Sequence, residues 1–240
     1  GLGAVTLPRR VNWQDRATCV LFGDGAGAVL LRATEEPTGI MATVLGADGS
    51  GGDALMVPAG GGAQPISHEA IDKGLHYLRM DGRQVYRFAT GVLGQATEQV
   101  ARKAGWKTEE IDLVIPHQAN LRIIAAAARR LNLPMERFAV NLQKYGNTSA
   151  ASVPIALCEC IEAGAVRPGD HLVLVGFGAG LTWGAVAVKW RLSAADVVSP
   201  FYRRWWRGMF YGWAHLRSSL RRGLRHFLVL FIRRADRRGR

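Results

Sequence analysis

Two residues, His117 and Asn147, have the types and surroundings from which a reaction site could be built. Each comes after a short apolar run, 113–115 or 138–142, and before a stretch with helical periodicity. An imidazole N–H and a carboxamide N–H can both donate hydrogen bonds to an oxygen that gains negative charge during a reaction. Taken alone, His117 could equally be a core or surface histidine, and Asn147 a turn or helix-capping residue.

The three cysteines offer poor candidates for a nucleophile. Cys19 falls in an apolar run that predicts a strand, and Cys158 and Cys160 lie in the helix predicted after Asn147. Cys158 follows Asn147 by 11 residues, which is roughly 16 Å along a helix. We therefore expect all three to be structural thiols. They provide neither a disulfide framework nor a CxxC metal-binding pair, which favours a reducing, cytoplasmic location.

The chain predicts strands and helices in alternation. This alternation favours an α/β fold, in which helices cover a parallel sheet and ligands bind beyond the carboxyl ends of the strands. His117 and Asn147 would lie at two of those ends. The predicted elements are strands 18–23 and 27–31, a loop over 44–55, a helix over 83–101, one helical turn at 108–110, strand 113–115, helix 121–131, strand 138–142, a helix that ends at Glu162, and strand 171–177.

An internal repeat relates CVLFGDGAGAVLL (19–31) to VLVGFGAGLTWGAVAV (173–188). Each copy has an apolar strand, a glycine-rich turn that begins with Phe and Gly, and a second strand. Two such hairpins about 150 residues apart indicate a duplicated fold in which both halves end in the same way. On this interpretation, the chain begins in the middle of the structure.

The composition is that of a globular protein, with 240 residues, 48% of them hydrophobic and 21% charged. Collagen-like and proline-rich disordered classes are therefore excluded. No apolar run is long enough to span a bilayer, and the residues after Gly1 do not resemble a signal peptide. Most of the net charge of +12 comes from residues 191–240, which hold 13 Arg and no Lys. The charge therefore says little about the partners of residues 1–190.

Five segments within residues 11–190 resemble the β-ketoacyl-acyl-carrier-protein synthase III family of the thiolase superfamily, in the family's order and spacing. The resemblance implies a layered αβαβα fold. Residues 1–32 would be the terminal strands of its first half, 33–190 the second half, and 191–240 an additional tail. The matching strings are DRATCVLFGDGAGAVLL (15–31), MDGRQVYRFA (80–89), VIPHQANLRII (114–124), KYGNTSAASVPIAL (144–157) and GFGAGLTWGAVAV (176–188).

The resemblance also implies a reaction. The family condenses an acyl-CoA primer with malonyl-acyl-carrier-protein in fatty acid biosynthesis, needs no metal or cofactor, and usually forms homodimers. Its nucleophilic Cys lies upstream of everything present here, so we expect that the chain cannot complete the condensation alone. The implied site residues are His117 and Asn147 for catalysis, the backbone of Gly178 and Ala179 for the oxyanion hole, Gly52 for the pantetheine arm, and Gln118, Ala119, Asn120, Leu121 and Arg122 for carrier-protein binding.

The tail places aromatic and aliphatic residues every three or four positions among its arginines. Over residues 200–232 this pattern is typical of a basic amphipathic helix on an anionic membrane surface. Nucleic-acid binding is a less favoured alternative, and a read-through or frameshift segment without a function is another. For the whole chain, the alternatives are a non-catalytic thiolase-like protein tethered to a membrane, or another thiolase-superfamily enzyme that condenses acyl-CoA with a different acceptor.

Overall fold

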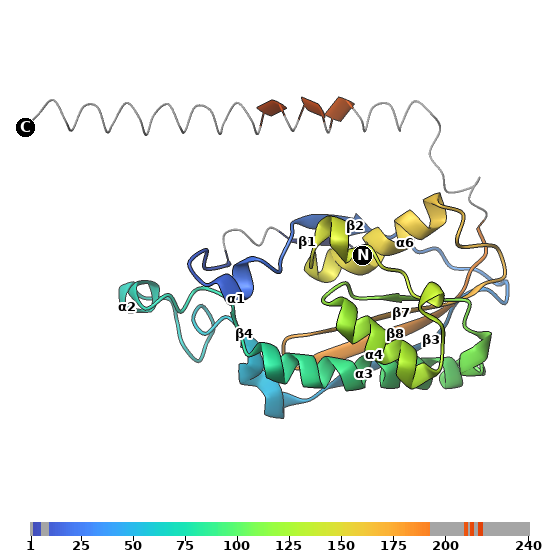
Figure 1. The fold of residues 1–240 in the computed structure, drawn as a ribbon, viewed down its shortest axis with the longest axis horizontal. Coiled ribbons are helices and arrows are strands. Elements are labelled where there is room, and N and C mark those ends of the chain that lie inside the picture. Colours follow the sequence, from blue (N-terminus) through green and yellow to red (C-terminus); the bar gives the residue numbers. More distant parts are fainter. Residues whose placement is uncertain (1, 6–9, 193–208, 211, 214–215, 218–240) are drawn as a thin grey trace, which may run out of the picture. The chain divides into compact units, whose positions relative to one another are not determined.

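The structure is a computed structural model, and it divides the chain into two units, residues 1–196 and 197–240, which are described separately. Figure 1 shows the fold. The residues that the structure describes are 2–5, 10–192, 209–210, 212–213 and 216–217.

A four-stranded sheet forms the centre of the first unit, in the strand order β3-β8-β7-β6 (Figure 1). Strand β8 runs antiparallel to both β3 and β7, whereas β6 and β7 are parallel. The sheet is therefore mixed, not parallel as the sequence predicted. Its strands are β3 (Gly39–Ala47), β6 (Leu113–Pro116), β7 (His171–Gly178) and β8 (Thr182–Lys189).

Helices cover both faces of this sheet. Helices α3 (Gly82–Lys103) and α4 (Leu121–Leu131) share one apolar core with Val114 of β6 and Val173 of β7. The neighbouring residues of the same strands point the other way, because side chains alternate along a strand. These residues pack against α6 (Ser152–Glu162) in a second core. The sequence predicted all three helices, and α4 begins and ends at the expected residues.

Polar side chains fix where the long helices begin and end. Asp81 accepts hydrogen bonds from the backbone N–H groups of Arg83 and Gln84 at the start of α3. Asn120 caps α4 in the same way, and Asn132 ends it in a left-handed conformation with φ 52°. The start of α3 and both ends of α4 are therefore defined locally, by the two capping side chains and by the left-handed backbone of Asn132.

The strand predicted over 138–142 is wrong. Only Phe138 forms a bridge, which is parallel to Val114, and Leu142–Tyr145 form the helical turn α5. The Gln118 side chain explains the early end of the pairing. Its amide N–H donates to the Ala139 carbonyl, and its oxygen accepts from the Asn141 N–H. These two backbone groups would otherwise be available to extend the pairing with a neighbouring strand.

The first copy of the repeat also differs from the prediction. The N-terminal part of the expected strand 18–23 is the short helix α1 (Arg16–Cys19), because Asp15 accepts from the Ala17 N–H and the Thr18 hydroxyl. The expected strand 27–31 is replaced by β2 (Gly25–Ala28), which pairs antiparallel with β1 (Leu2–Val5). The second copy forms the predicted hairpin, β7–β8.

Short elements complete the first unit. The predicted turn at 108–110 is confirmed, whereas the predicted loop 44–55 begins inside β3. The remaining elements are η2 (Gly49–Ala54), β4 (Leu55–Met56), α2 (His68–Asp72), β5 (Arg79–Met80), η3 (Thr108–Glu110), η4 (Met135–Arg137) and η5 (Ser149–Ala151).

The described residues of the second unit are helical. Met209, Phe210, Trp213 and Leu216 are 46%, 68%, 63% and 58% exposed. The rest of the amphipathic helix predicted over 200–232 lies outside the described residues. Among the helices that the structure describes, none combines the length and the apolar character needed to cross a membrane.

Candidate active site

His117 follows β6 directly, and the sheet fixes its position. Its backbone N–H donates to the Val175 carbonyl at 2.8 Å, which extends the parallel pairing of β6 with β7 by one residue. Its imidazole meets the ring of Phe177 edge-on, with 5.3 Å between the ring centroids. The predicted location of His117 at the carboxyl end of a strand is therefore confirmed.

A serine orients the His117 ring. Nδ1 of His117 lies 2.6 Å from the hydroxyl oxygen of Ser152, the buried first residue of α6. When this hydroxyl donates to Nδ1, Nε2 carries the ring proton and can donate to a substrate oxygen. Burial lowers the pKa of His117 to about 4, so the imidazole is neutral at pH 7. Sequence reasoning missed Ser152, although it lies in the segment GNTSAAS.

Asn147 is positioned by the N-terminal region and not by the end of a sheet strand, which corrects the prediction. Its backbone N–H donates to the Leu21 carbonyl at 3.0 Å, and its own carbonyl accepts from the Gly23 N–H at 2.9 Å. Phe22 and Asn147 form a parallel bridge between these two bonds. The connection from Asn147 to His117 runs through Ser152, five residues further along the chain.

The carboxamide of Asn147 is turned so that it can donate. Its Oδ1 accepts a hydrogen bond from the backbone N–H of Ser149 at 2.8 Å. Within the described residues, no acceptor is bonded to Nδ2, so both of its N–H groups are available to a ligand. The geometry thus provides a neutral imidazole and a donating amide on two segments that Ser152 links.

The glycine-rich turn between β7 and β8 lies next to the loop that contains Gly52. Asp48 and Leu181 exchange backbone hydrogen bonds of 2.8 and 2.9 Å. A Cβ atom at Gly52 would lie 3.6 Å from the Gly180 carbonyl oxygen. Gly178 ends β7 and Ala179 begins this turn, directly after the Phe177 that contacts His117. The structure therefore brings the predicted oxyanion-hole and pantetheine segments together beside β7.

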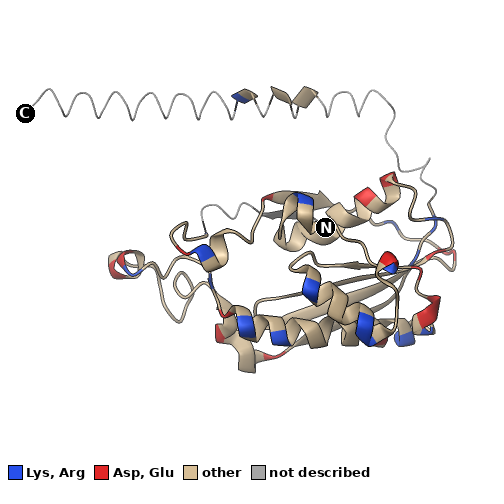
Figure 2. Ribbon diagram, viewed as in Figure 1, with Lys and Arg blue, Asp and Glu red and all other residues tan. Residues whose placement is uncertain are grey.

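The predicted carrier-protein segment divides into interior and surface residues. Gln118 is 1% exposed and bonded to backbone groups, so its side chain is unavailable to a surface partner, contrary to the prediction. Ala119 packs against the core, and the Asn120 side chain caps α4. Leu121 and Arg122 are exposed. Figure 2 shows further basic positions along α4 and α3.

The three cysteines lie on two helices. Cys19 ends α1, whereas Cys158 and Cys160 lie on α6. Cys158 is six residues beyond Ser152, or about 9 Å along the helix. Burial, together with the charge of Glu159, raises the pKa of the Cys160 thiol. No group of three or more His, Cys, Asp or Glu side chains in the described part of the chain could hold a metal ion.

Comparison with known families finds two matching models. Residues 2–49 match the model described as 3-oxoacyl-[acyl-carrier-protein] synthase III, and residues 101–190 match that described as the C terminal of the same synthase. Both matched regions contain residues of the site, since Leu21 and Gly23 lie in the first, and His117 and Asn147 in the second.

Curated relatives carry the same description. The chain is 53% identical over 189 residues to a β-ketoacyl-[acyl-carrier-protein] synthase III of Symbiobacterium thermophilum. It is 51% identical, also over 189 residues, to that of Caldanaerobacter subterraneus. In both cases, the match covers 79% of this chain and 57% of the relative. The chain therefore spans little more than half the length of these relatives.

Solved structures confirm the predicted thiolase-like α/β fold. The 3-oxoacyl-[acyl-carrier-protein] synthase III of Aquifex aeolicus superposes with a TM-score of 0.69 at 46% identity, covering 79% of this chain and 56% of the other. That of Thermus thermophilus gives a TM-score of 0.71 at 47% identity, with coverages of 79% and 58%.

The depressed pKa of His117 predicts a pH dependence of stability. Between pH 6.5 and pH 4, the unfolded chain binds a proton that the folded chain does not bind. The free energy of unfolding should therefore fall as the pH decreases through this window, and His117 should account for up to about 3 kcal/mol of the fall. Urea unfolding at several pH values measures this pH dependence of the free energy of unfolding.

The variant His117→Gln serves as the reference, because glutamine does not titrate. The difference in unfolding free energy between the two proteins should change between pH 6.5 and pH 4 and stay constant above pH 7. Parallel curves over the whole range would contradict the assignment of this fall to His117.

Proposed function

Because the chain belongs to the 3-oxoacyl-[acyl-carrier-protein] synthase III family, we propose that it carries the enolate-stabilising part of a decarboxylative condensation site. The substrates are acyl-CoA and malonyl-acyl-carrier-protein. The observation that supports this most directly is the neutral imidazole of His117, held at Nδ1 by Ser152, with the donating carboxamide of Asn147 on the linked segment.

The reaction proceeds in two steps. A thiolate attacks the carbonyl carbon of acyl-CoA; a new thioester forms, the bond to CoA breaks, and CoA leaves as a thiolate that takes up a proton. The malonyl thioester then loses carbon dioxide, and the electron pair of the broken C–C bond forms an enolate. The enolate carbon attacks the new thioester, a C–C bond forms, and the first thiolate is released.

His117 and Asn147 act in the second step. Nε2–H of His117 and Nδ2–H of Asn147 donate to the thioester oxygen as it becomes negatively charged. One donor of this kind is typically worth about 3 kcal/mol of transition-state stabilisation. A neutral imidazole suits the role, because it donates a hydrogen bond without releasing its proton to the enolate. The pKa of about 4 keeps His117 neutral throughout the physiological range.

The glycine-rich turn and the carrier segment complete the proposal. Backbone around Gly178 and Ala179 donates to the oxyanion of acyl transfer, and Gly52 lies along the pantetheine arm. Leu121 and Arg122 present an apolar and a cationic side chain to the acidic carrier protein. The proposal includes assembly as a homodimer and a cytoplasmic location, which the resemblance to the family implies.

Exchange of segments tests the roles of His117 and Asn147. Residues 11–190 would replace the matching segment of the Symbiobacterium thermophilum relative, which supplies the rest of its own polypeptide. We expect the chimera to condense acetyl-CoA with malonyl-acyl-carrier-protein. His117→Ala or Asn147→Ala should lower its kcat at least 100-fold, which corresponds to the loss of one oxyanion donor.

The matched control in the chimera is His68→Ala, which removes an exposed histidine of α2. It should leave kcat within twofold of the unsubstituted chimera. Acylation of the chimera by labelled acetyl-CoA should persist in all three variants, because the two donors act after that step. Condensation that survives loss of either donor would refute the proposed roles.

We propose further that none of the three cysteines of this chain is the acyl-carrying nucleophile. A nucleophilic cysteine needs a depressed thiol pKa, whereas the pKa of Cys160 is raised. Cys19 ends α1, and Cys158 lies six residues after Ser152 on α6, or about 9 Å along that helix. The thiolate of the first step therefore comes from polypeptide other than these 240 residues.

Incubation with labelled acetyl-CoA checks this expectation. Intact-mass analysis of the chain should show no acetyl adduct after the reaction time that saturates the chimera. Iodoacetamide provides the control, since it should alkylate the exposed Cys158 and so show that the thiols are reduced. A stable acetyl thioester on any of the three cysteines would overturn the proposal.

For residues 197–240, we propose binding to an anionic membrane surface. The exposure of the aliphatic Leu216 together with Phe210 and Trp213 on helical backbone favours this function over nucleic-acid binding. A lipid surface buries aliphatic and aromatic side chains alike, whereas stacking on bases uses the aromatic ones. The arginines of the tail would contact lipid phosphates. This surface binding is compatible with either the condensing or a non-catalytic role of residues 1–190.

Vesicle co-sedimentation tests the tail. The full chain should pellet with vesicles containing phosphatidylserine, and Phe210→Ser, Trp213→Ser and Leu216→Ser together should lower the bound fraction at least fivefold. Leu30→Ser with Leu31→Ser, at exposed positions in the first unit, should leave binding unchanged. The proposal is refuted if the tail variant and the unsubstituted chain sediment equally with the vesicles. It is also refuted if neither protein binds vesicles and both bind a DNA duplex with equal affinity.

A further inference from the structure

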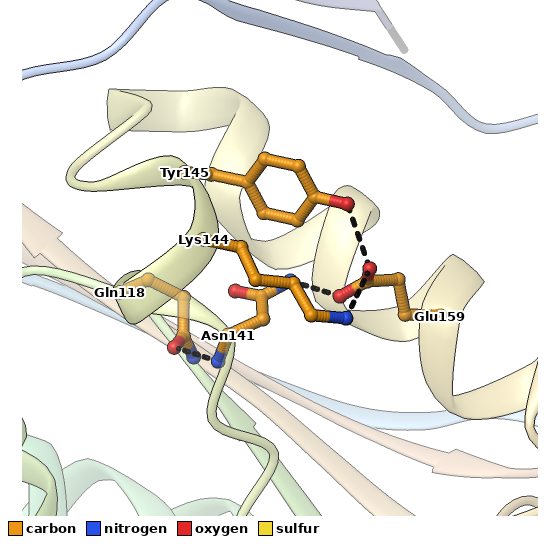
Figure 3. Close-up of polar contacts among 5 residues, drawn as sticks. All are labelled: Gln118, Asn141, Lys144, Tyr145 and Glu159. Carbon is orange, nitrogen blue, oxygen red and sulfur yellow. Dashed lines mark hydrogen bonds and ion pairs between the residues drawn. The ribbon is translucent and has the colours of Figure 1, made fainter.

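Five polar side chains near the candidate active site form a connected cluster that the condensation does not itself use (Figure 3). They are Gln118, Asn141, Lys144, Tyr145 and Glu159, and we call them the Glu159 cluster. Its members come from the residue after His117, from the segment before Asn147, and from α6. The cluster therefore includes residues that adjoin, along the chain, both proposed oxyanion donors.

Glu159 receives three bonds from the segment that leads to Asn147. Its Oε2 accepts from Nδ2 of Asn141 at 2.8 Å. Its Oε1 accepts from the Tyr145 hydroxyl at 2.7 Å and from Nζ of Lys144 at 3.2 Å. Figure 3 shows the three donors converging on the one carboxylate.

Gln118 ties the other end of the cluster to the sheet. Its Nε2 donates to the carbonyls of Pro116 and Ala139, at 2.8 and 3.0 Å, and its Oε1 accepts from the Asn141 N–H at 3.0 Å. Asn141 thus bonds to Gln118 through its backbone and to Glu159 through its side chain. A continuous set of hydrogen bonds runs from the neighbour of His117 to α6.

The segment that the cluster holds cannot define its own position. Helix α5 has four residues, whereas isolated helices need about 12–15 to be even marginally stable. Tyr145 ends α5, Gly146 then turns with φ 66°, and Asn147 follows. The backbone bonds of Asn147 to Leu21 and Gly23 hold one side of this segment. The direction in which Asn147 leaves α5 depends in addition on what anchors Tyr145 and Lys144.

Glu159 is suited to anchor several donors at once. Its side chain is 28% exposed. Burial tends to raise its pKa, but the hydrogen bonds from Asn141, Tyr145 and Lys144, with the Lys144 charge, outweigh this effect and hold the pKa below its usual value. The group is thus a carboxylate at neutral pH, and bonds to a charged acceptor are stronger than those to a neutral one.

We propose that Glu159 is a positioning residue that holds the α5 segment on α6 and thereby sets the place of Asn147 relative to His117. The inference rests on the proposed function of those two residues, and it adds a residue that touches neither substrate nor the reacting atoms. Glu159 acts on the reaction through its bonds to Tyr145, Lys144 and Asn141.

Amide hydrogen exchange in the full chain tests this proposal. The Gly146 N–H donates to the Leu142 carbonyl and the Asn147 N–H to the Leu21 carbonyl, so both report on the segment. Glu159→Ala should accelerate exchange at these two amides at least tenfold, while the amides of β7 change by less than twofold. Glu159→Gln keeps an acceptor oxygen and should restore exchange to within about threefold of the unsubstituted chain.

Glu98→Ala is the matched control, because Glu98 also joins two elements through an ion pair, with Arg130 of α4 at 3.0 Å. Glu98→Ala should leave the exchange rates of the Gly146 and Asn147 amides unchanged. The proposal fails if Glu159→Ala raises the exchange rates of these two amides no more than Glu98→Ala does, or if it raises those of the β7 amides equally. It also fails if exchange in Glu159→Gln is as fast as in Glu159→Ala. Exchange requires no turnover, so this failure is separable from a failure of the chimera to condense.

Discussion

The parallel pairing of β6 with β7 is the constraint on which the candidate active site depends. Val114 and Val173 are opposite one another in this register and are fully buried, so a shift of the pairing would remove both from their places in the core that they share with α3 and α4. The pairing continues to the His117 N–H and the Val175 carbonyl. It thereby brings His117 against Phe177, and so next to the glycine-rich turn that follows Phe177.

Beyond the strand ends, hydrogen bonds from side chains fix the chain in place of strand pairing. Gln118 satisfies backbone groups of the 139–141 segment, and Ser152 satisfies Nδ1 of His117. Both are almost fully buried, and both place their polar atoms against polar partners, which offsets the free energy lost on leaving water. The result is an irregular region with defined positions, which suits a site whose donors must be preorganised.

Sequence periodicity predicted the parts of the fold that depend on local pattern. Helix α4 and the β7–β8 hairpin have clear apolar spacing and clear turn residues, so their positions could be expected. The strands predicted over 18–23 and 138–142 failed for a different reason. Asp15 in one case and Gln118 in the other form side-chain hydrogen bonds that compete with backbone pairing. The spacing of apolar residues does not reveal such bonds.

The candidate site was predictable only in part, for the same reason. The residue type of His117 and its position after a strand indicated a site. Its hydrogen bond with Ser152 could not be expected, because the two residues are 35 positions apart in the sequence. The interior place of Gln118 was also hidden, because a glutamine beside a helix start is usually a surface residue. Contacts between polar groups distant in sequence decide both cases, and they require the folded backbone.

The two borders of the sheet differ in a way that matters for handling the protein. Beyond β6, the Phe138 bridge and the Gln118 bonds cover the strand, whereas β3 pairs on one side only among the described residues. Ile40, Met41 and Leu45 of β3 are 52%, 40% and 85% exposed. A long, apolar, uncapped strand invites backbone pairing with a further strand from any source. Concentrated solutions of these 240 residues should therefore grow into strand-to-strand aggregates unless another polypeptide covers β3 first.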